Sequence, residues 1–272
     1  MNAVTLTLKP DLIDLVDCGD LLPAKLCPMS SDEIGKQKLK VARSMRPVAD
    51  IFDIETAPGD ATLRIRGGTN RLQRVGAGMD GGRLIVDGNV GDYLGHELIS
   101  GELLVSGDAG DFAASGQRDG LIHVKGNVRD YAGGAADAEM RGLKGGTLVV
   151  SGLCGDFLGY KMRRGIIIAH DVVGDYCANN MIAGTIILGQ KCGNYLGIGM
   201  RRGTVLFLEK TKIDLPTFNL CGQFSLPILT VLRHHLHSVS HQAAMQLAKI
   251  QKVQRYCGDL GFDGQGEILV AT

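Results

Sequence analysis

Short runs of aliphatic and β-branched residues recur along the middle of the chain, each just after a glycine. They occupy residues 83–86, 102–105, 121–124, 147–150, 166–169, 185–188 and 204–207. In every run the second and fourth positions are apolar, which is typical of a strand with one buried face. The pattern therefore predicts one strong strand in each unit of a repeat.

A Gly-Asp-Tyr or Gly-Asp-Phe triplet follows most of these runs and sets their spacing. Its acidic column reads Asp92, Asp111, Asp130, Asp156, Asp175 and Asn194, with steps of 19, 19, 26, 19 and 19 residues. The long step is one unit with a seven-residue insertion within 133–145. A 19-residue unit is too short for a βαβ crossover, although its strands must all run the same way. Each unit is therefore expected to form one coil of a stack.

We predict an all-β fold, a single-stranded right-handed parallel β-helix of about seven coils with a 19-residue repeat. Residues 1–60 would form an N-terminal arm and cap, 61–208 the parallel β-helix, and 209–272 a C-terminal extension with helices. Helical spacing of apolar residues predicts helices over 226–236 and 243–253, with Pro227 in a first turn. A further helix is expected to start at Ser30-Ser31-Asp32-Glu33.

Composition agrees with this architecture and narrows the classes of function. Of 39 glycines in 272 residues, 31 lie between Gly67 and Gly203, where we expect them to supply the positive φ angles of the corners. Lys and Arg total 29, as do Asp and Glu, so the chain has no net charge to attract nucleic acid or an anionic membrane, and we expect neither as a partner. Seven cysteines without tight spacing, a start without leader character and the lack of a long apolar stretch predict a cytoplasmic protein.

The acidic column allows two interpretations. It could bind a metal ion or act in acid–base catalysis, or its carboxylates could accept backbone N–H bonds at tight turns. Asparagine at position 194 favours the second, because an amide can hold a turn but is a poor ligand or base. We therefore predict a structural corner ladder, with no catalytic residue and no metal assigned.

Two arginine pairs occupy matching places in the repeat. Arg163 and Arg164 end the motif Gly-Tyr-Lys-Met-Arg-Arg-Gly, and Arg201 and Arg202 end Gly-Ile-Gly-Met-Arg-Arg-Gly. The methionines should point inward and leave the arginines outside. These arginines are either ordinary solvated side chains or a contact for an acidic partner surface or a carboxylated carrier.

The third position of each strand should face outward, yet it is mostly apolar. We define the docking ridge as Ile85, Leu104, Val149, Ile168, Ile187 and Leu206, with His123 at the corresponding place in one coil. An exposed apolar ridge of this length would be a liability in a monomer. We expect the C-terminal helix, a partner subunit, or both to cover it.

Histidines offer the remaining candidate chemistry. His234, His237 and His241 share a helix face and could form a zinc site, but no nearby cysteine or acid supports one, so a solvated helix end is favoured. His123 and His170 fall in different columns of the repeat. A stand-alone β-helix enzyme or ligand-binding protein that uses the groove around them and the arginines is the alternative from another class.

The coil motifs resemble a known family. Gly-x-Gly-Met-Arg-Arg-Gly and Gly-Asp-Tyr/Phe repeats resemble the domain shared by the C-terminal part of glutamate synthase and the C subunit of formylmethanofuran dehydrogenase. Residues 12–33, with Leu-Leu-Pro-Ala-Lys-Leu at 21–26, and residues 255–269 look like the ends of that protein and of its bacterial counterpart in formyltransferase/hydrolase complexes. The resemblance covers nearly the whole chain, although Ala114 and Ala178 replace the glycine of the equivalent coil position.

This resemblance implies a noncatalytic scaffold subunit of a hetero-oligomeric one-carbon complex. The implied partners are an amidohydrolase-like chain, a molybdopterin-enzyme-like chain and, in the bacterial form, a formyltransferase. Such a complex would move a formyl group between tetrahydromethanopterin and a methanofuran-type carrier and release formate during formaldehyde oxidation, whereas the archaeal type reduces CO2. No cofactor is expected on this chain itself.

Overall fold

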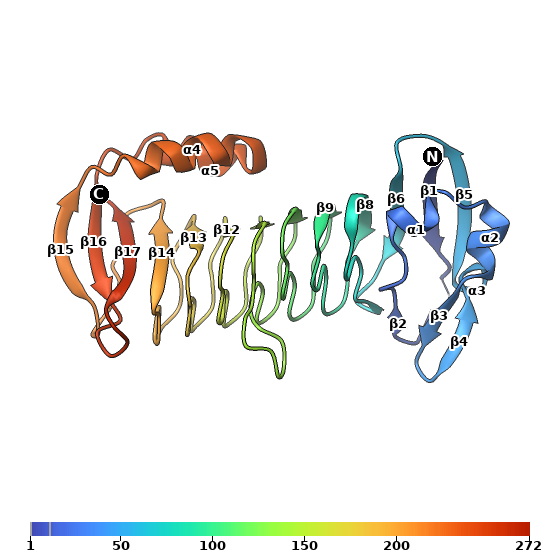
Figure 1. Cartoon of the computed structure of the whole chain (residues 1–272), viewed down its shortest axis with the longest axis horizontal. Coiled ribbons are helices and arrows are strands. Elements are labelled where there is room, and N and C mark those ends of the chain that lie inside the picture. The colour runs from blue at the N-terminus through green and yellow to red at the C-terminus, as the bar shows by residue number, and fades with distance from the viewer. Residues whose placement is uncertain (1, 11) are drawn as a thin grey trace.

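The computed structural model describes residues 2–10 and 12–272 of the chain. The molecule is an elongated rod whose strands lie side by side along the long axis, with the N-terminal and C-terminal parts at opposite ends (Figure 1). Its 13-stranded sheet has the order β15-β16-β17-β14-β13-β12-β11-β10-β9-β8-β6-β1-β5. All neighbours from β17 to β1 pair in parallel, which confirms an all-β chain with a large, mostly parallel sheet.

The central strands come from successive repeats. They are β6 (Thr62–Gly68), β8 (Asp80–Gly88), β9 (Ser100–Val105), β10 (Leu121–Val124), β11 (Thr147–Val150), β12 (Ile166–Ala169), β13 (Thr185–Leu188) and β14 (Arg202–Phe207). Residues at the same repeat position lie opposite each other, so Ile122 pairs with Leu103 on one side and Leu148 on the other. A second set of parallel bridges joins Ala109, Val128, Cys154, Val173 and Cys192 in succession.

Side chains at the second and fourth strand positions fill the interior, as the alternation predicts. The second position is completely buried from Leu84 to Val205, and Val86 and Phe207 at the fourth position are at most 1% exposed. The inward methionines, Met79, Met162, Met181 and Met200, are also completely buried. Full burial of such a side chain contributes about 2 kcal/mol. Because each repeat packs these side chains against those of the adjacent repeats, this stabilisation requires the stack as a whole.

The N-terminal part adds strands beyond the first coil. β1 (Asn2–Leu8) pairs in parallel with β6 and antiparallel with the edge strand β5 (Phe52–Pro58). A separate four-stranded sheet has the order β4-β3-β2-β7. The elements of this part are β2 (Val16–Asp17), α1 (Pro23–Leu26), α2 (Ser31–Lys36), β3 (Lys38–Val41), β4 (Ser44–Pro47), α3 (Val48–Ile51) and β7 (Leu72–Gln73). Ser30 and Glu33 form a capping box, which confirms the predicted helix start.

The C-terminal part returns to the sheet. β17 (Gln265–Ala271) pairs in parallel with β14, and β16 (Val253–Gly258) and β15 (Asn219–Phe224) follow as antiparallel strands. The helices are α4 (Ile228–Val239) and α5 (His241–Leu247). The prediction of helix as far as 253 is wrong, because Val253 is completely buried and begins β16. No helix within residues 2–10 and 12–272 is long and apolar enough to cross a membrane.

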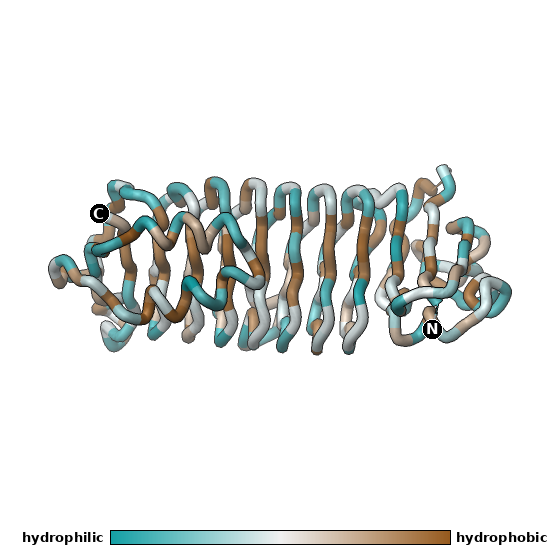
Figure 2. Tube along the Cα trace, turned by 90° about the horizontal axis from the view of Figure 1, so that it is seen from above, coloured by the Kyte–Doolittle hydropathy of each residue, from teal (hydrophilic) through white to brown (hydrophobic). Residues whose placement is uncertain are grey.

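Helices α4 and α5 lie across the outer face of the sheet over its C-terminal strands, whereas the strands nearer the N-terminal part are bare on this face (Figures 1 and 2). Under the helices a second apolar cluster forms outside the stack. Its sheet members include Val149, Ile168, Ile187, Leu206 and Leu269, and its helix members include Leu229, Leu236 and Leu247. The sheet is therefore buried on both faces at one end of the rod and on one face in the middle.

Candidate functional site

The acidic column forms a line of hydrogen bonds that runs from coil to coil. At each step the carboxylate Oδ1 accepts the backbone N–H of the residue at the same position in the next coil, at 2.7–3.1 Å. The line runs through Asp92, Asp111, Asp130, Asp156, Asp175 and Asn194, and the Asp92 N–H itself donates to Gln73 Oε1 at 2.9 Å. These carboxylates therefore hold backbone groups of neighbouring coils together.

The glycine before the acidic residue leaves room for this bond. A Cβ at Gly110, Gly155, Gly174 or Gly193 would collide with the carboxylate Oδ1 of the preceding coil. The left-handed conformation that we expected at glycine also occurs at the aromatic residue of the corner. There φ is 61° at Tyr93, 59° at Phe112, Tyr131, Phe157 and Tyr176, and 63° at Tyr195. Consecutive rings stack with centroids 4.7–5.1 Å apart. This stacking offsets the conformational cost of a positive φ angle at a residue other than glycine.

The insertion between β10 and β11 folds back onto earlier coils. Glu139 Oε1 lies 3.7 Å from His96 Nε2, and Lys144 Nζ lies 3.3 Å from Glu97 Oε1. Burial lowers the pKa of His96, although the nearby Glu139 carboxylate acts in the opposite direction. These pairs join residues from different coils, so sequence reasoning missed them. They fix the insertion beside a cavity of about 450 Å³ that Tyr131, Tyr160 and Lys161 help to line.

The two arginine pairs lie at the surface. Arg164, Arg201 and Arg202 are exposed and Arg163 is half-buried. Arg202 Nε donates to Gln265 Oε1 at 2.9 Å, and none of these four side chains forms an ion pair with a carboxylate in the part of the chain that the structure describes. Their charges are thus available to an external anionic group.

The docking ridge is divided by the C-terminal helices. Val149, Ile168, Ile187 and Leu206 are at most 1% exposed, because α4 and α5 cover them. Ile85, Leu104 and the neighbouring His123 are half-buried and have no such cover. Only this remainder, which we call the uncovered ridge (Ile85, Leu104 and His123), can accept a partner. It is much shorter than the ridge expected from the sequence.

The two sheet histidines differ in their surroundings. His123 Nε2 lies 3.1 Å from Ser151 Oγ on the uncovered part of the sheet. His170 is 9% exposed, and its Nε2 lies 2.9 Å from Ser240 Oγ, at the junction of α4 and α5. Burial is the main reason that the pKa of each imidazole is lowered. His170 thus links the stack to the helices. None of the five cavities described for residues 2–10 and 12–272 is lined by His123, His170 and the arginine pairs together.

The C-terminal histidines are at the surface. His234, His237 and His241 are exposed, and the rings of His237 and His241 have centroids 5.7 Å apart. Within residues 2–10 and 12–272, no three His, Cys, Asp or Glu side chains are arranged to hold a metal ion.

The interior cysteines are chemically quiet. Cys154 and Cys177 are buried, and this burial raises the pKa of both thiols. Burial raises the pKa of the half-buried Cys192 to about 11. At neutral pH these thiols stay protonated, and the thiolate needed for nucleophilic attack or metal binding is scarce.

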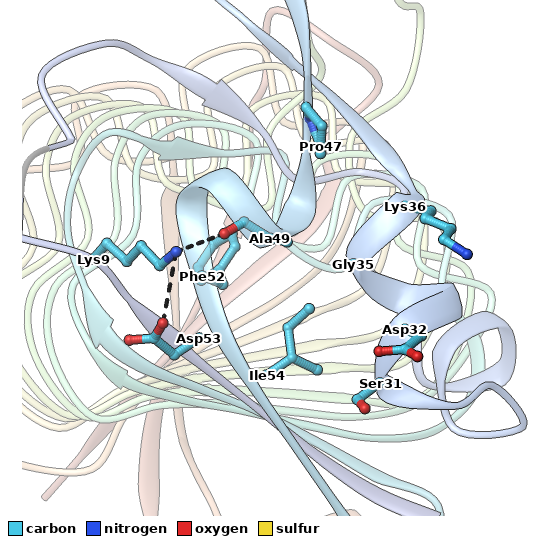
Figure 3. A pocket seen from close by; sticks show the side chains of 10 residues that line it. All are labelled: Lys9, Ser31, Asp32, Gly35, Lys36, Pro47, Ala49, Phe52, Asp53 and Ile54. Carbon is cyan, nitrogen blue, oxygen red and sulfur yellow. Dashed lines mark hydrogen bonds and ion pairs between the residues drawn. The ribbon is translucent and has the colours of Figure 1, made fainter.

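A surface cavity of about 600 Å³ lies in the N-terminal part (Figure 3). Lys9 Nζ donates to the carbonyl oxygen of Ala49 at 2.6 Å and lies 3.6 Å from Asp53 Oδ1. Ser31 and Asp32 of α2 lie on the opposite side of the cavity. Because Lys9 is already paired with groups of α3 and β5, its contacts hold these elements together more than they prepare a catalytic group.

Comparisons with known proteins identify relatives of the chain. No model of a protein family matches it. The chain is 40% identical over 90 residues to the C subunit of the formyltransferase/hydrolase complex Fhc of Methylorubrum extorquens, and 33% identical over 95 residues to the C subunit of the tungsten-containing formylmethanofuran dehydrogenase 2 of Methanococcus maripaludis. The matched segments cover 33% and 35% of this chain and span about a third of each relative, 34% and 35% of their lengths.

A solved structure matches over almost the full length. It is the crystal structure of the formyltransferase/hydrolase complex (FhcABCD) from Methylorubrum extorquens in complex with methylofuran. The TM-score is 0.90 with 38% identity, over 98% of this chain and 99% of the matched chain. The relative from that organism shows which component of its complex the sequence resembles. The chain therefore belongs to the family of formyltransferase/hydrolase complex C subunits.

Proposed function

We propose that the chain is a noncatalytic structural and docking subunit of a formyltransferase/hydrolase complex. The observation that carries this proposal is the full-length likeness to a chain of a multi-subunit complex, at 38% identity and a TM-score of 0.90. The described residues are consistent with the role, because their acidic column holds backbone groups and their interior thiols stay protonated. The protein would act by holding other chains in place.

The stack is best interpreted as one right-handed, single-stranded parallel β-helix. Two features support this: the strands keep a constant repeat register, and a second set of parallel bridges joins the same coils. In this interpretation residues 1–60 are the arm, 61–208 the β-helix and 209–272 the extension that covers its last coils. A rod of this kind offers a long rigid surface to partners.

The complex would act in the cytoplasm on formyl groups. The partners would be an amidohydrolase-like chain, a molybdopterin-enzyme-like chain and a formyltransferase. The related complex was crystallised with methylofuran, which supports a carrier of the methanofuran type. We propose that formyl groups pass between tetrahydromethanopterin and this carrier, with release of formate, and that this chain binds neither compound as a cofactor of its own.

Two surfaces are proposed for contacts within the complex. The uncovered ridge presents Ile85 and Leu104 between the ion pairs Arg64–Asp87 (2.7 Å) and Arg83–Glu102 (2.9 Å), an apolar centre with a polar rim. The arginine pairs present unpaired positive charge that suits a carboxylate-bearing carrier or an acidic partner surface.

Affinity purification from the native organism would test the assignment. The tagged full-length chain should elute from size-exclusion chromatography with the three other subunit types, which mass spectrometry would identify, and the fraction should release formate from a formylated carrier. A fraction that reduces CO2 and contains iron–sulfur subunits would instead indicate the dehydrogenase type. A tagged chain that elutes alone as a monomer would contradict the proposal.

A further inference from the structure

Each rung of the corner ladder consists of the acidic residue, or Asn194, and the aromatic residue that follows it. The last rung is Asn194 and Tyr195. In every earlier coil the corner makes two bonds to the next: the acidic Oδ1 accepts an N–H at 2.7–3.1 Å, and the aromatic residue's N–H donates to a carbonyl at 2.8–2.9 Å. Tyr176, for example, donates to the carbonyl oxygen of Asn194 at 2.9 Å. Each rung is thus bonded and stacked by the rung that follows it.

Asn194 and Tyr195 have no following rung. Within residues 2–10 and 12–272, the Tyr195 N–H has no hydrogen-bond partner and nothing donates to Asn194 Oδ1, whose amide nitrogen is directed at Asp175 Oδ1 (3.3 Å). The Tyr195 ring stacks on Tyr176 at a centroid distance of 4.7 Å, and Tyr195 is the most exposed aromatic residue of the ladder, at 55%. A donor, an acceptor and a ring face are left open together.

The chain does not fill this place with another corner. After β14 it runs past the end of the ladder, and residues 212–218 form the opposite wall of a cavity of about 540 Å³. Asn194, Tyr195 and Ile198 line one side, and Lys212, Asp214 and Leu215 line the other. This volume is in the range of small-molecule sites, and its walls combine apolar surface with a few polar groups.

We propose that this cavity binds a planar aromatic ring that carries an adjacent amide. The ring stacks on the open face of Tyr195, the ligand's N–H donates to Asn194 Oδ1, and its carbonyl accepts the Tyr195 N–H. These are the contacts that each rung makes with the next, so the ligand takes the place of the missing rung. The ligand class is that of aromatic amides, including an aromatic amino-acid residue. This site does not depend on the proposed assembly role.

A titration of the isotope-labelled full-length chain by NMR tests this site, with N-acetyl-L-tyrosinamide as the probe. The Tyr195 amide resonance should shift on binding. N-acetyl-L-leucinamide, which has the amide but no ring, should bind at least about fivefold more weakly, because ring stacking is lost. Equal binding of the two amides, or no shift up to the solubility limit of the probe, would overturn the proposal.

Variants at the last rung separate ring stacking from hydrogen bonding. Tyr195→Ala and Asn194→Leu should each weaken the probe by about five- to tenfold, which corresponds to loss of a stacking contact or a hydrogen bond. Asn194→Asp keeps the acceptor and introduces the residue of the earlier rungs, so it should fold normally and bind within about twofold of the parent. Tyr93→Ala, at the other end of the ladder, is the matched control and should leave the affinity unchanged. Undiminished binding to Tyr195→Ala would refute the site.

Discussion

The two halves of the outer sheet face are built from the same repeat but end in different states. Over β11–β14, Val149, Ile168, Ile187 and Leu206 are at most 1% exposed because α4 and α5 cover them. Over β8 and β9, the equivalent Ile85 and Leu104 are half-buried and uncovered. An outward apolar position in a repeat therefore has no fixed meaning. It is core where the chain folds back over it and a candidate contact surface where it does not.

The largest expected effect is a difference in the free energy of unfolding between equivalent substitutions in the two halves. Leu206→Asp places a carboxylate under the helices and should lower the free energy of unfolding by about 4 kcal/mol or more, since a buried charge without a partner is among the most damaging changes. Leu104→Asp, its equivalent on the uncovered half, should change it by less than about 1 kcal/mol. Urea unfolding of the two variants measures the difference, and equal losses would show that the halves do not differ in this way.

For binding to the partner subunits, we expect the uncovered half of the outer face to be the more sensitive one. Leu104→Asp is expected to weaken binding to the partner subunits about 100-fold, since apolar residues at the centre of an interface dominate its affinity. Met45→Asp, at a 58% exposed position in the N-terminal part, is the matched control and should have no effect. Surface plasmon resonance with the purified partner subunits would measure this. Parent-like affinity of Leu104→Asp would remove the uncovered ridge from the interface.

A smaller effect is expected at the arginine pairs. Arg201→Glu should raise the KM of the assembled complex for a glutamate-bearing carrier about tenfold, with little change in kcat, because a charge-assisted contact would become a repulsion. Arg43→Glu, an exposed arginine of the N-terminal part, should leave KM unchanged. Steady-state kinetics decide whether these arginines contact the carrier or are ordinary solvated side chains. An unaltered KM for Arg201→Glu would show that they are ordinary solvated side chains.

The smallest effect concerns pH and the covered half. Burial lowers the pKa of His170, so below about pH 6.5 the unfolded chain binds a proton that the folded chain resists. This contribution to stability is complete above that pH and is lost as the pH falls toward the folded pKa. The urea concentration at the unfolding midpoint should therefore decrease when the pH is lowered from 7.5 to 5.5. The decrease should be smaller in His170→Gln. His237→Gln, at an exposed site, should behave like the parent. A fall of the same size in His170→Gln would contradict this role.

Some parts of the site could be predicted from the sequence because they recur in every repeat. The spacing from Asp92 to Asn194 gave the order of the coils, and the alternation from Leu84 to Val205 identified a column that is completely buried. Single contacts had no such signal. Glu139 reaches His96 and Ser240 reaches His170 at sequence separations that no repeat specifies.

The left-handed corner shows the same limit in one residue. Glycine was the natural candidate for positive φ, yet Tyr131 and the other ladder aromatics adopt it as well. Stacking on rings above and below, at 4.8–5.0 Å for Tyr131, compensates for the strain. Tyr93 and Tyr195 at the two ends adopt the same conformation with one stacked ladder ring each. The support therefore comes from a ring about one repeat away in the chain, which a propensity argument for one residue does not include.

The sequence by itself determined the strands, their parallel order and the interior columns, because identical positions in a short repeat must meet when the coils stack. Only the tertiary structure decided what happens where the repeat stops. The return of β17 to pair with β14, the position of α4 and α5 over one half of the outer face, and the open rung at Tyr195 all depend on contacts between segments that share no pattern. A repeat specifies contacts between its own copies, and the surfaces at its ends are set by whatever part of the chain can bury them.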